Sequence, residues 1–413
     1  MIKFDLFFFI KNFFNLGFIQ ISGILLQFLL MPLITRRYGV EIFGEFVLTT
    51  NFAYLIGNLI NFGTNQTEIK KISINHDNNN KLSLFISNTL WLRMFIFFVF
   101  SFFSLFFIFI YSNNYILIWL SLLPFLIAEI FNPIYFLIGI EKLSWITWGN
   151  IITRSISYLL IFFTTIKLND SILLNLFIGT PLLVFYLVLM LFLLKQYQLK
   201  LCKPNIDFII KNLKNNFHVT FNGSVGMLQQ TIFLFFIANN YSMSILGSYA
   251  IIDKLLNAFR QFISVFSTSI YPRSAQIFYN NKPAWLTFRF QIRRLYIYFS
   301  LIASLILFYF SEQIVTLISN DHNRMTSYFI KLLSPSLIFL SMNATNVLDF
   351  LLNEQYEGMF IVSIFILINT ILISFILTSH IYNISIGWYP LLIEASCFFI
   401  YTYAVKKFKL NAI

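Results

Sequence analysis

Residues 31–65 read MPLITRRYGVEIFGEFVLTTNFAYLIGNLINFGTN, and this stretch decides which fold the sequence predicts. It ends one long apolar segment with a proline and two arginines, turns at Gly39, and opens a second apolar segment that carries a row of asparagines. A similar stretch follows 203 positions later, where Gly247 occupies the place of Gly44. Such an internal repeat predicts two related halves joined in one chain.

The composition is that of an integral membrane protein. Hydrophobic residues make up 58% of the chain and charged residues 11%, and the mean hydropathy is +0.78, whereas charged residues make up about 25% of a soluble protein. The formal net charge of +12 does not indicate a nucleic-acid partner, because cytoplasmic loops of membrane proteins are enriched in Lys and Arg. The two cysteines, Cys202 and Cys397, suggest neither a disulfide framework nor a metal site.

Apolar segments of about 20 residues, the length that crosses a bilayer core, recur along the chain. The first lacks a small-residue cleavage site, so we expect a retained helix rather than a signal peptide. The fold class predicted is an all-α integral membrane protein with about twelve transmembrane helices. The expected spans are residues 12–34, 42–62, 88–111, 115–139, 144–166, 172–194, 217–238, 246–271, 294–311, 328–350, 359–379 and 384–405.

The positions of Lys and Arg orient these spans. With a cytoplasmic N-terminus, most of the 28 Lys and Arg residues fall in inside segments, as the positive-inside rule requires. Both termini are therefore expected in the cytoplasm, which supports an even number of spans. The longest polar stretch lies at the midpoint and divides the chain into an N-terminal six-helix half (1–194), a cytoplasmic basic linker (195–216) and a C-terminal six-helix half (217–413).

A polar stripe marks the second expected span, and a counterpart marks the eighth. In both, polar residues recur three and four positions apart, which places them on one face of a helix. The stripe of the second span is Asn51, Tyr54, Asn58, Asn61 and Asn65. The matching positions of the eighth span hold Lys254, Asn257, Gln261, Ser264 and Thr268.

Polar residues on a spanning helix must face protein or a water-filled cavity, because an unpaired amide or charge in hydrocarbon is costly. An even number of spans per half preserves orientation, so we expect parallel repeats about an axis along the membrane normal, as in some secondary transporters. The two stripes would then face each other across a central cavity. The alternative, which stays open for any single residue, is that these side chains only join neighbouring helices by hydrogen bonds.

Three motifs stand out: PLITRRYGVEIFGEF at residues 32–46, NFG at residues 61–63, and Lys254 and Arg260 followed by YPR at residues 271–273. They resemble motifs of polysaccharide flippases of the Wzx type, which belong to the multidrug/oligosaccharidyl-lipid/polysaccharide exporter (MOP/MATE-like) superfamily. Residues 32–46, PLITRRYGVEIFGEF, look like the family's P-x-x-x-R-x-x-G-x-E-x-[FY]-G-x-[FY] signature. Residues 61–63, NFG, match its D-F-G or N-F-G motif. Lys254, Arg260 and the YPR of residues 271–273 resemble its K…LYPR pattern, although Asp253 directly adjoins Lys254 here, which puts the usual pairing of an earlier acidic residue in doubt.

The resemblance implies a function in polysaccharide biosynthesis. Members of this family export an undecaprenyl-diphosphate-linked oligosaccharide across the bacterial inner membrane, from the inner to the outer leaflet, for O-antigen (lipopolysaccharide) or a related polymer. The implied partners are this lipid-linked substrate and the lipid bilayer, with a polysaccharide polymerase and a chain-length regulator as further candidates. No nucleic acid is expected.

Basic and amide side chains are the candidate substrate-binding residues. Cations suit a diphosphate, and amides and hydroxyls suit sugars. The cations are Arg36, Arg37, Arg93, Arg154, Lys254 and Arg260, and the hydrogen-bonding residues are Asn51, Tyr54, Asn58, Asn61, Asn257 and Gln261. The alternatives are that Arg36 and Arg37 lie among lipid headgroups and that Arg93 and Arg154 extend to the cytoplasmic surface.

Acidic residues in or beside spans are candidates for coupling to an ion gradient, since a buried carboxylate can take a proton or help hold Na⁺. They are Glu45, Glu129, Asp253, Asp349 and Glu394. The alternative is a salt bridge to an intramembrane cation. Five prolines inside expected spans should bend the helices; they are Pro124, Pro133, Pro181, Pro335 and Pro390. No cofactor beyond H⁺ or Na⁺ is expected.

Enzymatic functions fit the sequence poorly. The four histidines show no H-x-x-x-H or H-E-x-x-H spacing, and the sequence lacks a Walker A motif; no metal site and no enzyme activity are expected. Three rivals remain: a drug/cation antiporter of the same superfamily, a membrane polysaccharide polymerase, and a structural membrane protein. A polymerase would be expected to show a large outer loop, and the repeated polar stripes argue against a purely structural protein.

Overall fold

The computed structural model describes residues 28–75, 78–111, 116–140, 142–164, 170–320, 323–379, 383–408 and 410. The chain forms two compact units, which we describe separately. The N-terminal unit is Phe46–Thr231, and the C-terminal unit is Met1–Glu45 together with Ile232–Ile413. The regular structure of the described residues is helical in both units.

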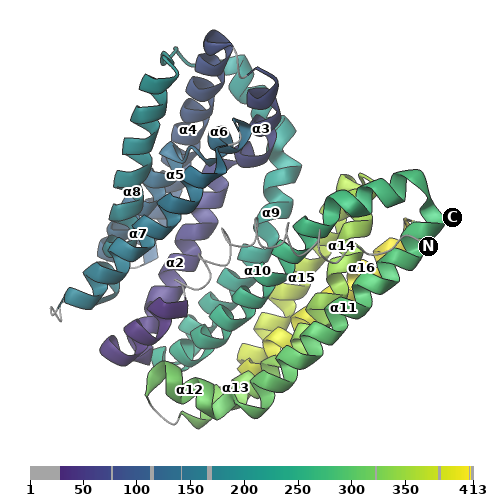
Figure 1. The fold of residues 1–413 in the computed structure, drawn as a ribbon. Coiled ribbons are helices and arrows are strands. Elements are labelled where there is room, and N and C mark those ends of the chain that lie inside the picture. Colours follow the sequence, from purple (N-terminus) through teal and green to yellow (C-terminus); the bar gives the residue numbers. More distant parts are fainter. Residues whose placement is uncertain are drawn as a thin grey trace. The chain divides into compact units, whose positions relative to one another are not determined.

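The N-terminal unit is a helical bundle (Figure 1). Its helices are α2 (Val40–Asn61), which starts in the other unit, α3 (Thr64–Ile74), α4 (Asn79–Tyr111), α5 (Ile116–Phe131), α6 (Ile134–Gly139), α7 (Leu143–Phe163), α8 (Asp170–Gln196) and the first part of α9 (Ile206–Asn240). α5 packs along α8, and α6 packs against α3. Gly179 makes the first contact possible, because a Cβ there would lie 2.8 Å from the backbone nitrogen of Phe125.

The C-terminal unit is also a helical bundle (Figure 1). It contains a helix over 28–38, the end of α9, α10 (Met243–Asn280), α11 (Lys282–Tyr309), α12 (Ser311–Ser319), α13 (Arg324–Leu333), α14 (Ser336–Leu352), α15 (Tyr356–Ser379), the 3₁₀-helix η2 (Asn383–Trp388) and α16 (Tyr389–Lys407). α14 packs against both α11 and α16, and its buried face lies in the core of the unit.

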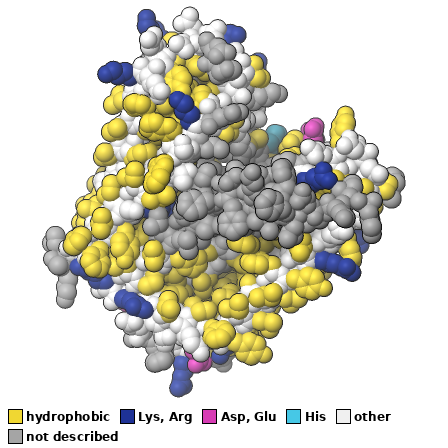
Figure 2. Space-filling view, in the orientation of Figure 1, with side chains coloured by type: hydrophobic (Ala, Val, Ile, Leu, Met, Phe, Trp, Pro, Cys, Tyr) yellow, Lys and Arg dark blue, Asp and Glu magenta, His cyan; other side chains and the backbone are white. Residues whose placement is uncertain are grey.

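The helices have the length and surface of membrane spans. Within the described residues, nine segments are long and apolar enough to cross a bilayer. Side chains on α4 that a soluble protein would bury are exposed at helical spacing, among them Phe95, Phe98 and Phe102, and Figure 2 shows hydrophobic side chains over broad areas of the surface. The chain is therefore an all-helical, multi-pass membrane protein, as predicted.

The remaining three of the twelve expected spans have different explanations. Most of span 12–34 lies outside the described residues. The other two correspond to α2 and α10, which form long helices but are not among the nine apolar segments. These are the two helices with the polar stripes, and their polar residues lower their hydropathy. The count of twelve in two six-helix halves stays a prediction.

Prolines affect the helices in two ways. Pro124 and Pro181 lie inside the continuous helices α5 and α8. Pro133 and Pro335 instead stand at boundaries where one expected span divides into two helices, α5 and α6 or α13 and α14. Pro390 lies in the first turn of α16, where its missing N–H costs nothing.

The segment expected as a basic linker, 195–216, differs from a simple loop. α9 begins at Ile206, so the second half of this segment is helical. The stretch before α9 is fixed to α4, because Ser83 Oγ and Ser87 Oγ accept hydrogen bonds from the backbone nitrogens of Lys200 and Cys202 at 3.0 and 2.8 Å. Asn88 Oδ1 accepts a third, from Asn205 N, at 3.0 Å.

Two glycines that the repeat places in equivalent positions meet within the C-terminal unit. A Cβ on Gly44 would lie 2.5 Å from the backbone nitrogen of Gly247. A Cβ on Gly247 would lie 1.9 Å from the carbonyl oxygen of Val40. The start of α2 therefore crosses α10 backbone against backbone, which only residues without a side chain allow.

Candidate functional site

The polar stripe of the second span is interrupted in the structure. α2 ends at Asn61, and Phe62 and Gly63 follow with φ of 41° and 68°. This left-handed turn starts a separate helix, α3, at Thr64. The prediction that Asn65 continues the stripe on the same helix is therefore wrong, because Gly63 permits a backbone conformation that ends the helix.

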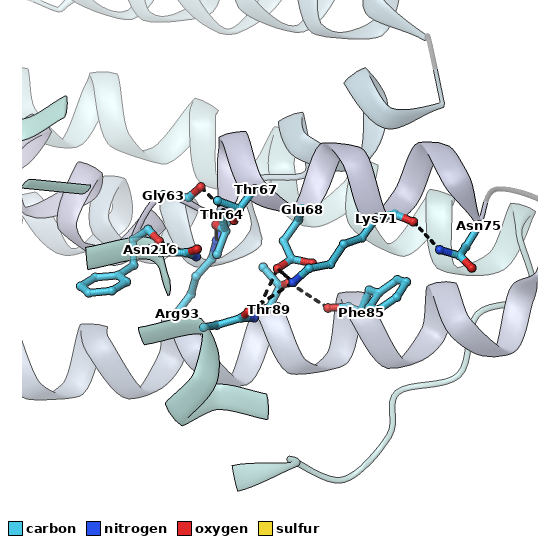
Figure 3. Close-up of polar contacts among 12 residues, drawn as sticks. Gly63, Thr64, Thr67, Glu68, Lys71, Asn75, Phe85, Thr89, Arg93 and Asn216 are labelled. Carbon is cyan, nitrogen blue, oxygen red and sulfur yellow. Dashed lines mark hydrogen bonds and ion pairs between the residues drawn. The ribbon is translucent and has the colours of Figure 1, made fainter. Parts of the chain in front are cut away.

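Arg93 on α4 lies beside this interruption and is fully buried (0% exposed). Its Nη2 donates to Thr64 Oγ1 at 2.8 Å and to Asn65 Oδ1 at 2.9 Å, and its Nε donates to Thr64 Oγ1 at 3.1 Å. Its guanidinium also lies 4.8 Å from the ring centroid of Tyr135. Figure 3 shows Arg93 reaching from α4 towards Thr64. The alternative that Arg93 extends to the membrane surface is therefore wrong.

The same guanidinium contacts the interruption between α5 and α6. Its Nη1 donates to the carbonyl oxygens of Asn132 at 2.6 Å, Glu129 at 3.3 Å and Ile130 at 3.5 Å. These carbonyls face Arg93 because Pro133 has no N–H to continue the helix. Among the described residues, no carboxylate lies within ion-pair distance of Arg93.

Glu129, a candidate for ion coupling, accepts hydrogen bonds from two amides. Asn61 Nδ2 lies 2.7 Å and Asn132 Nδ2 lies 2.8 Å from the same carboxylate oxygen, Oε2. Gly57 on α2 makes room for the side chain, since a Cβ there would lie 3.0 Å from Glu129 Cγ. The structure thus brings together Asn61, Arg93 and Glu129, which the sequence analysis had assigned to two different roles.

The other stripe residues of α2 differ in their surroundings. Asn58 Nδ2 donates to Ser224 Oγ of α9 at 2.8 Å, so this side chain does join two helices. Tyr54 is exposed, with its ring edge-on to Phe125 at 5.0 Å between centroids. Asn51 is buried. Their role in a cavity stays a prediction.

The sequence analysis missed a polar cluster on α3. Glu68 is fully buried, and its Oε1 accepts from Lys71 Nζ at 2.7 Å and from Asn212 Nδ2 at 3.3 Å. Lys71 also donates to Asn212 Oδ1 at 3.2 Å. Glu68 and Lys71 lie on α3, towards α4 (Figure 3). Span length and hydropathy do not reveal this cluster, because α3 has only 11 residues and is too polar to register as a span.

The second polar stripe lies on α10, which runs without interruption. Asp253 is buried and accepts from Asn257 Nδ2 at 3.2 Å. Lys254 is partly buried next to it, and Gln261 is exposed. Arg260 donates through Nε at 3.1 Å and through Nη2 to the buried carboxylate of Glu394 on α16.

Asp349, another coupling candidate, is also bound to an arginine. Its Oδ2 lies 2.7 Å from Arg289 of α11, and its Oδ1 accepts from Trp285 Nε1 at 3.3 Å. Arg289 was expected in a loop before the ninth span, but α11 already starts at Lys282. For Asp349 and Glu394, the salt-bridge alternative is therefore the observed arrangement.

The remaining candidates are Arg36, Arg37, Arg154 and Glu45. Arg36 is exposed and donates to the carbonyl oxygen of Leu317 at the end of α12, and Arg37 lies 5.7 Å from the ring of Tyr38. Arg154 on α7 and Glu45 on α2 are partly buried. The described residues hold no group of three or more His, Cys, Asp and Glu that could bind a metal ion.

Sequence comparison identifies the family. Proteins described as "Polysaccharide biosynthesis protein" match residues 9–278 of the chain. The chain belongs to this family. A protein of Escherichia coli (strain K12) named "Putative O-antigen transporter" is 24% identical over 274 residues. That match spans 64% of the chain and 64% of the relative's length.

Solved structures share the fold of this family member. An inward-facing multidrug resistance MATE family transporter of the MOP superfamily has a TM-score of 0.76 at 11% identity, covering 97% of the chain and 95% of that transporter. The lipid II flippase MurJ has a TM-score of 0.71 at 14% identity, covering 95% and 87%. The predicted family resemblance and the MATE-like helical fold are confirmed.

Proposed function

We propose that the chain is a flippase for undecaprenyl-diphosphate-linked oligosaccharide repeat units. It would move them from the inner to the outer leaflet of the bacterial inner membrane, for O-antigen or related polysaccharide biosynthesis. The observation that carries the proposal is the family match over residues 9–278 in a chain with a membrane-transporter fold. The printed name of the E. coli relative supports the same class of substrate.

Substrate binding would use the two kinds of polar side chain that the stripes provide. Lys254 and Arg260 on α10 would bind the diphosphate, since a guanidinium and an ammonium both suit phosphate oxygens. Glu394 occupies Nε and Nη2 of Arg260 and would keep Nη1 oriented. Exposed or partly buried groups such as Tyr54, Asn58 and Gln261 would bond sugar hydroxyls.

Alternating access would be coupled to an H⁺ or Na⁺ gradient through Glu129. Glu394 and Asp349 are already bound to Arg260 and Arg289, so a change in their charge would leave a buried arginine without its partner. Glu129 accepts only amide hydrogen bonds on its side chain among the described residues. Its carboxylate can therefore bind or release a cation without breaking an ion pair.

The direct test uses a bacterium whose own flippase gene is deleted and which makes the matching repeat unit. The wild-type chain should restore surface polysaccharide, and Lys254→Gln should reduce it at least tenfold, because one lost charge-assisted contact changes binding by about that factor. Arg260→Gln is best combined with Glu394→Gln, so that no buried carboxylate is left alone. Arg324→Gln, an exposed change at the start of α13, is the control.

Normal polymer in both Lys254→Gln and the Arg260→Gln/Glu394→Gln double variant would contradict the binding proposal. Equal amounts of each protein in the membrane must be shown by immunoblot. Cysteines at Asn58 and Gln261, in a Cys202→Ser background, should react with a water-soluble thiol reagent, whereas cysteines at Leu59 and Phe262 should not. Equal protection at all four positions would favour the alternative that the stripes only join helices.

A drug/cation antiporter is the second candidate, and the MATE transporter fold favours it. Cells that overproduce the chain should then expel a cationic dye and grow at higher dye concentrations. We expect neither effect. Dye efflux without restoration of surface polysaccharide would replace the proposed function.

The proposed location follows from the positive-inside bias of the sequence. Both termini would lie in the cytoplasm of a bacterial cell, with a polysaccharide polymerase and a chain-length regulator acting on the exported units. A fusion of a fluorescent protein that folds only in the cytoplasm, joined after residue 413, should be fluorescent. A dark fusion with an active periplasmic reporter at the same position would contradict this orientation.

A further inference from the structure

Two helix interruptions meet at one arginine in the N-terminal unit. The first separates α2 from α3 at Phe62 and Gly63, and the second separates α5 from α6 at Asn132 and Pro133. Each interruption leaves backbone groups without helical partners. Inside a membrane such groups must be satisfied by the protein itself, since hydrocarbon offers no donors.

Arg93 supplies the donors at the second interruption. Its Nη1 donates to Asn132 O at 2.6 Å and to Glu129 O at 3.3 Å. In an uninterrupted helix the N–H of residue 133 would bond to Glu129 O, but a proline stands there. The guanidinium thus replaces a hydrogen bond that the sequence of α5 and α6 cannot form.

Arg93 fixes the first interruption with its other two nitrogens. Nε and Nη2 donate to Thr64 Oγ1, and Nη2 also donates to Asn65 Oδ1. The side chain is 0% exposed, and its guanidinium lies over the ring of Tyr135. Every nitrogen of the guanidinium therefore has an acceptor within the protein.

The two interruptions also deliver the two amides that bind Glu129. Asn61 is the last residue of α2, and Asn132 lies between α5 and α6. Both donate to Glu129 Oε2, at 2.7 and 2.8 Å. The position of this carboxylate therefore depends on the same two segments that Arg93 connects.

We propose that Arg93 is a positioning residue for Glu129. It holds the α2–α3 and α5–α6 interruptions together, so that Asn61 and Asn132 bind one oxygen of the carboxylate and leave the other available. Arg93 acts through the backbone and these amides, not by touching the carboxylate. The inference deepens the proposed function, since it rests on the coupling role of Glu129.

Arginine is required at this position because of its geometry. The guanidinium is a planar fork with five N–H donors, whereas an ammonium is a single point with three. A lysine at 93 would keep the charge but could not reach Thr64 and Asn132 together. Arg93→Lys therefore keeps the positive charge but removes the simultaneous contacts with Thr64 and Asn132. Arg324→Lys, on an exposed residue, is the matched control.

The first measurement is hydrogen exchange of the purified full-length protein. In Arg93→Lys, amides in 60–66 and in 129–136 should exchange at least tenfold faster, and amides in α8 should be unchanged. A factor of ten corresponds to about 1.4 kcal/mol, less than the loss of one buried charge-assisted bond. Unchanged exchange at both interruptions, or faster exchange at only one, would overturn the proposal.

The second measurement is transport in vesicles as a function of the coupling ion. The midpoint for H⁺ or Na⁺ should shift by about tenfold in Arg93→Lys, while the maximal rate at saturating ion is kept. Arg93 is the charged side chain that acts on Glu129, and a lysine there keeps that charge. Tyr54 of α2 and Tyr186 of α8, which Glu129 also influences, are unchanged in this variant. A lower maximal rate with an unshifted midpoint would overturn the positioning role.

Failure of the proposed coupling would look different. If Glu129→Gln kept the ion dependence of the wild type, the coupling role would be wrong whatever Arg93→Lys does. Faster exchange at both interruptions would then still show that Arg93 holds the α2–α3 and α5–α6 interruptions together. A shifted midpoint in Arg93→Lys together with loss of ion dependence in Glu129→Gln would support both.

Discussion

Positions separated by the repeat distance of 203 residues hold Gly57 on α2 and Arg260 on α10. In the N-terminal unit, the glycine leaves space that Glu129 fills, and the acid is bonded by two amides. In the C-terminal unit, the arginine itself bonds the acid, Glu394. The residue at this repeat position therefore acts differently in the two units: Gly57 makes room for a carboxylate that amides bond, whereas Arg260 itself forms the ion pair.

The helices differ at a second pair of related positions. Gly63 follows α2 and adopts φ of 68°, whereas Phe266 lies inside the continuous helix α10. The N-terminal unit thus has an interrupted helix with an amide-bonded acid, and the C-terminal unit has a continuous helix with an ion-paired acid. Ion pairs stabilise a fixed charge, and an amide-bonded acid next to an interruption is better suited to a charge that changes.

The largest effect is expected from breaking an ion pair of the C-terminal unit. Asp349→Asn would leave Arg289, which is only 13% exposed, without its counter-charge. Loss of one partner of a buried pair costs about 3–5 kcal/mol. The thermal unfolding temperature of the protein in detergent should fall by roughly 3–6 °C.

The control for this prediction is an exposed pair of the same type. Glu312→Gln removes the partner of Lys331, in a pair 3.5 Å long whose acid is 73% exposed. Such pairs contribute about 0–1 kcal/mol, so the unfolding temperature should hardly change. Equal shifts in the two variants would show that burial does not distinguish these ion pairs.

The second prediction concerns the contact between α2 and α10, where both helices carry a glycine, Gly44 and Gly247. Gly247→Ala would put a Cβ 1.9 Å from the carbonyl oxygen of Val40, and a backbone atom cannot turn aside. Overpacking of this kind costs about 1–3 kcal/mol, so the unfolding temperature of the variant should fall by roughly 1–3 °C. Gly226→Ala, where a Cβ would meet nothing within 4 Å, is the control and should unfold no lower than the wild type.

The sequence predicted helix boundaries well where the apolar segment is just long enough to cross the bilayer. The fifth span was expected to start at residue 144 and α7 starts at Leu143; the eleventh was expected to end at 379 and α15 ends at Ser379. Helix ends that continue beyond the apolar part were missed, as in α9, because hydropathy measures contact with lipid and not hydrogen bonding along the backbone.

Asn61, Arg93 and Glu129 are among the candidates named from the sequence, but the contacts between them do not follow from the sequence. Gly63 and Pro133 both mark interruptions in the sequence, and Arg93 and Glu129 were both named as candidates. Nothing local in the sequence shows that Arg93 reaches the carbonyl of Asn132, since that contact depends on how three helices pack. Lys71 and Glu68 were missed for the opposite reason: their short polar helix resembles a loop.

A smaller effect on stability is expected from a side chain at Gly63, in the turn between α2 and α3. Gly63→Ala would place a Cβ on a residue with φ of 68°, which costs an L-residue about 1–2 kcal/mol. The control is Gly223→Ala in α9, where a Cβ has open space and alanine should stabilise the helix by up to about 1 kcal/mol. We expect the unfolding temperature to fall in Gly63→Ala and to rise in Gly223→Ala. An unchanged or higher unfolding temperature in Gly63→Ala would show that a side chain does not strain the turn at Gly63.

Glu129→Gln is expected to have the smallest effect on stability. Its effect on transport is the most informative test of function. Glutamine keeps a carbonyl oxygen that can accept from Asn61 and Asn132 and has nearly the same volume, so the unfolding free energy should change by less than about 1 kcal/mol. Its side chain carries no charge that a cation could neutralise, so transport measured in vesicles should no longer respond to the ion gradient. Glu394→Gln should do the reverse, because it leaves Arg260 without its counter-charge and lowers stability while it keeps Glu129, the proposed coupling residue. If Glu129→Gln instead unfolded as readily as Glu394→Gln, the amide-bonded acid would be as structural as the ion-paired one, and the difference between the two units would carry no consequence for transport.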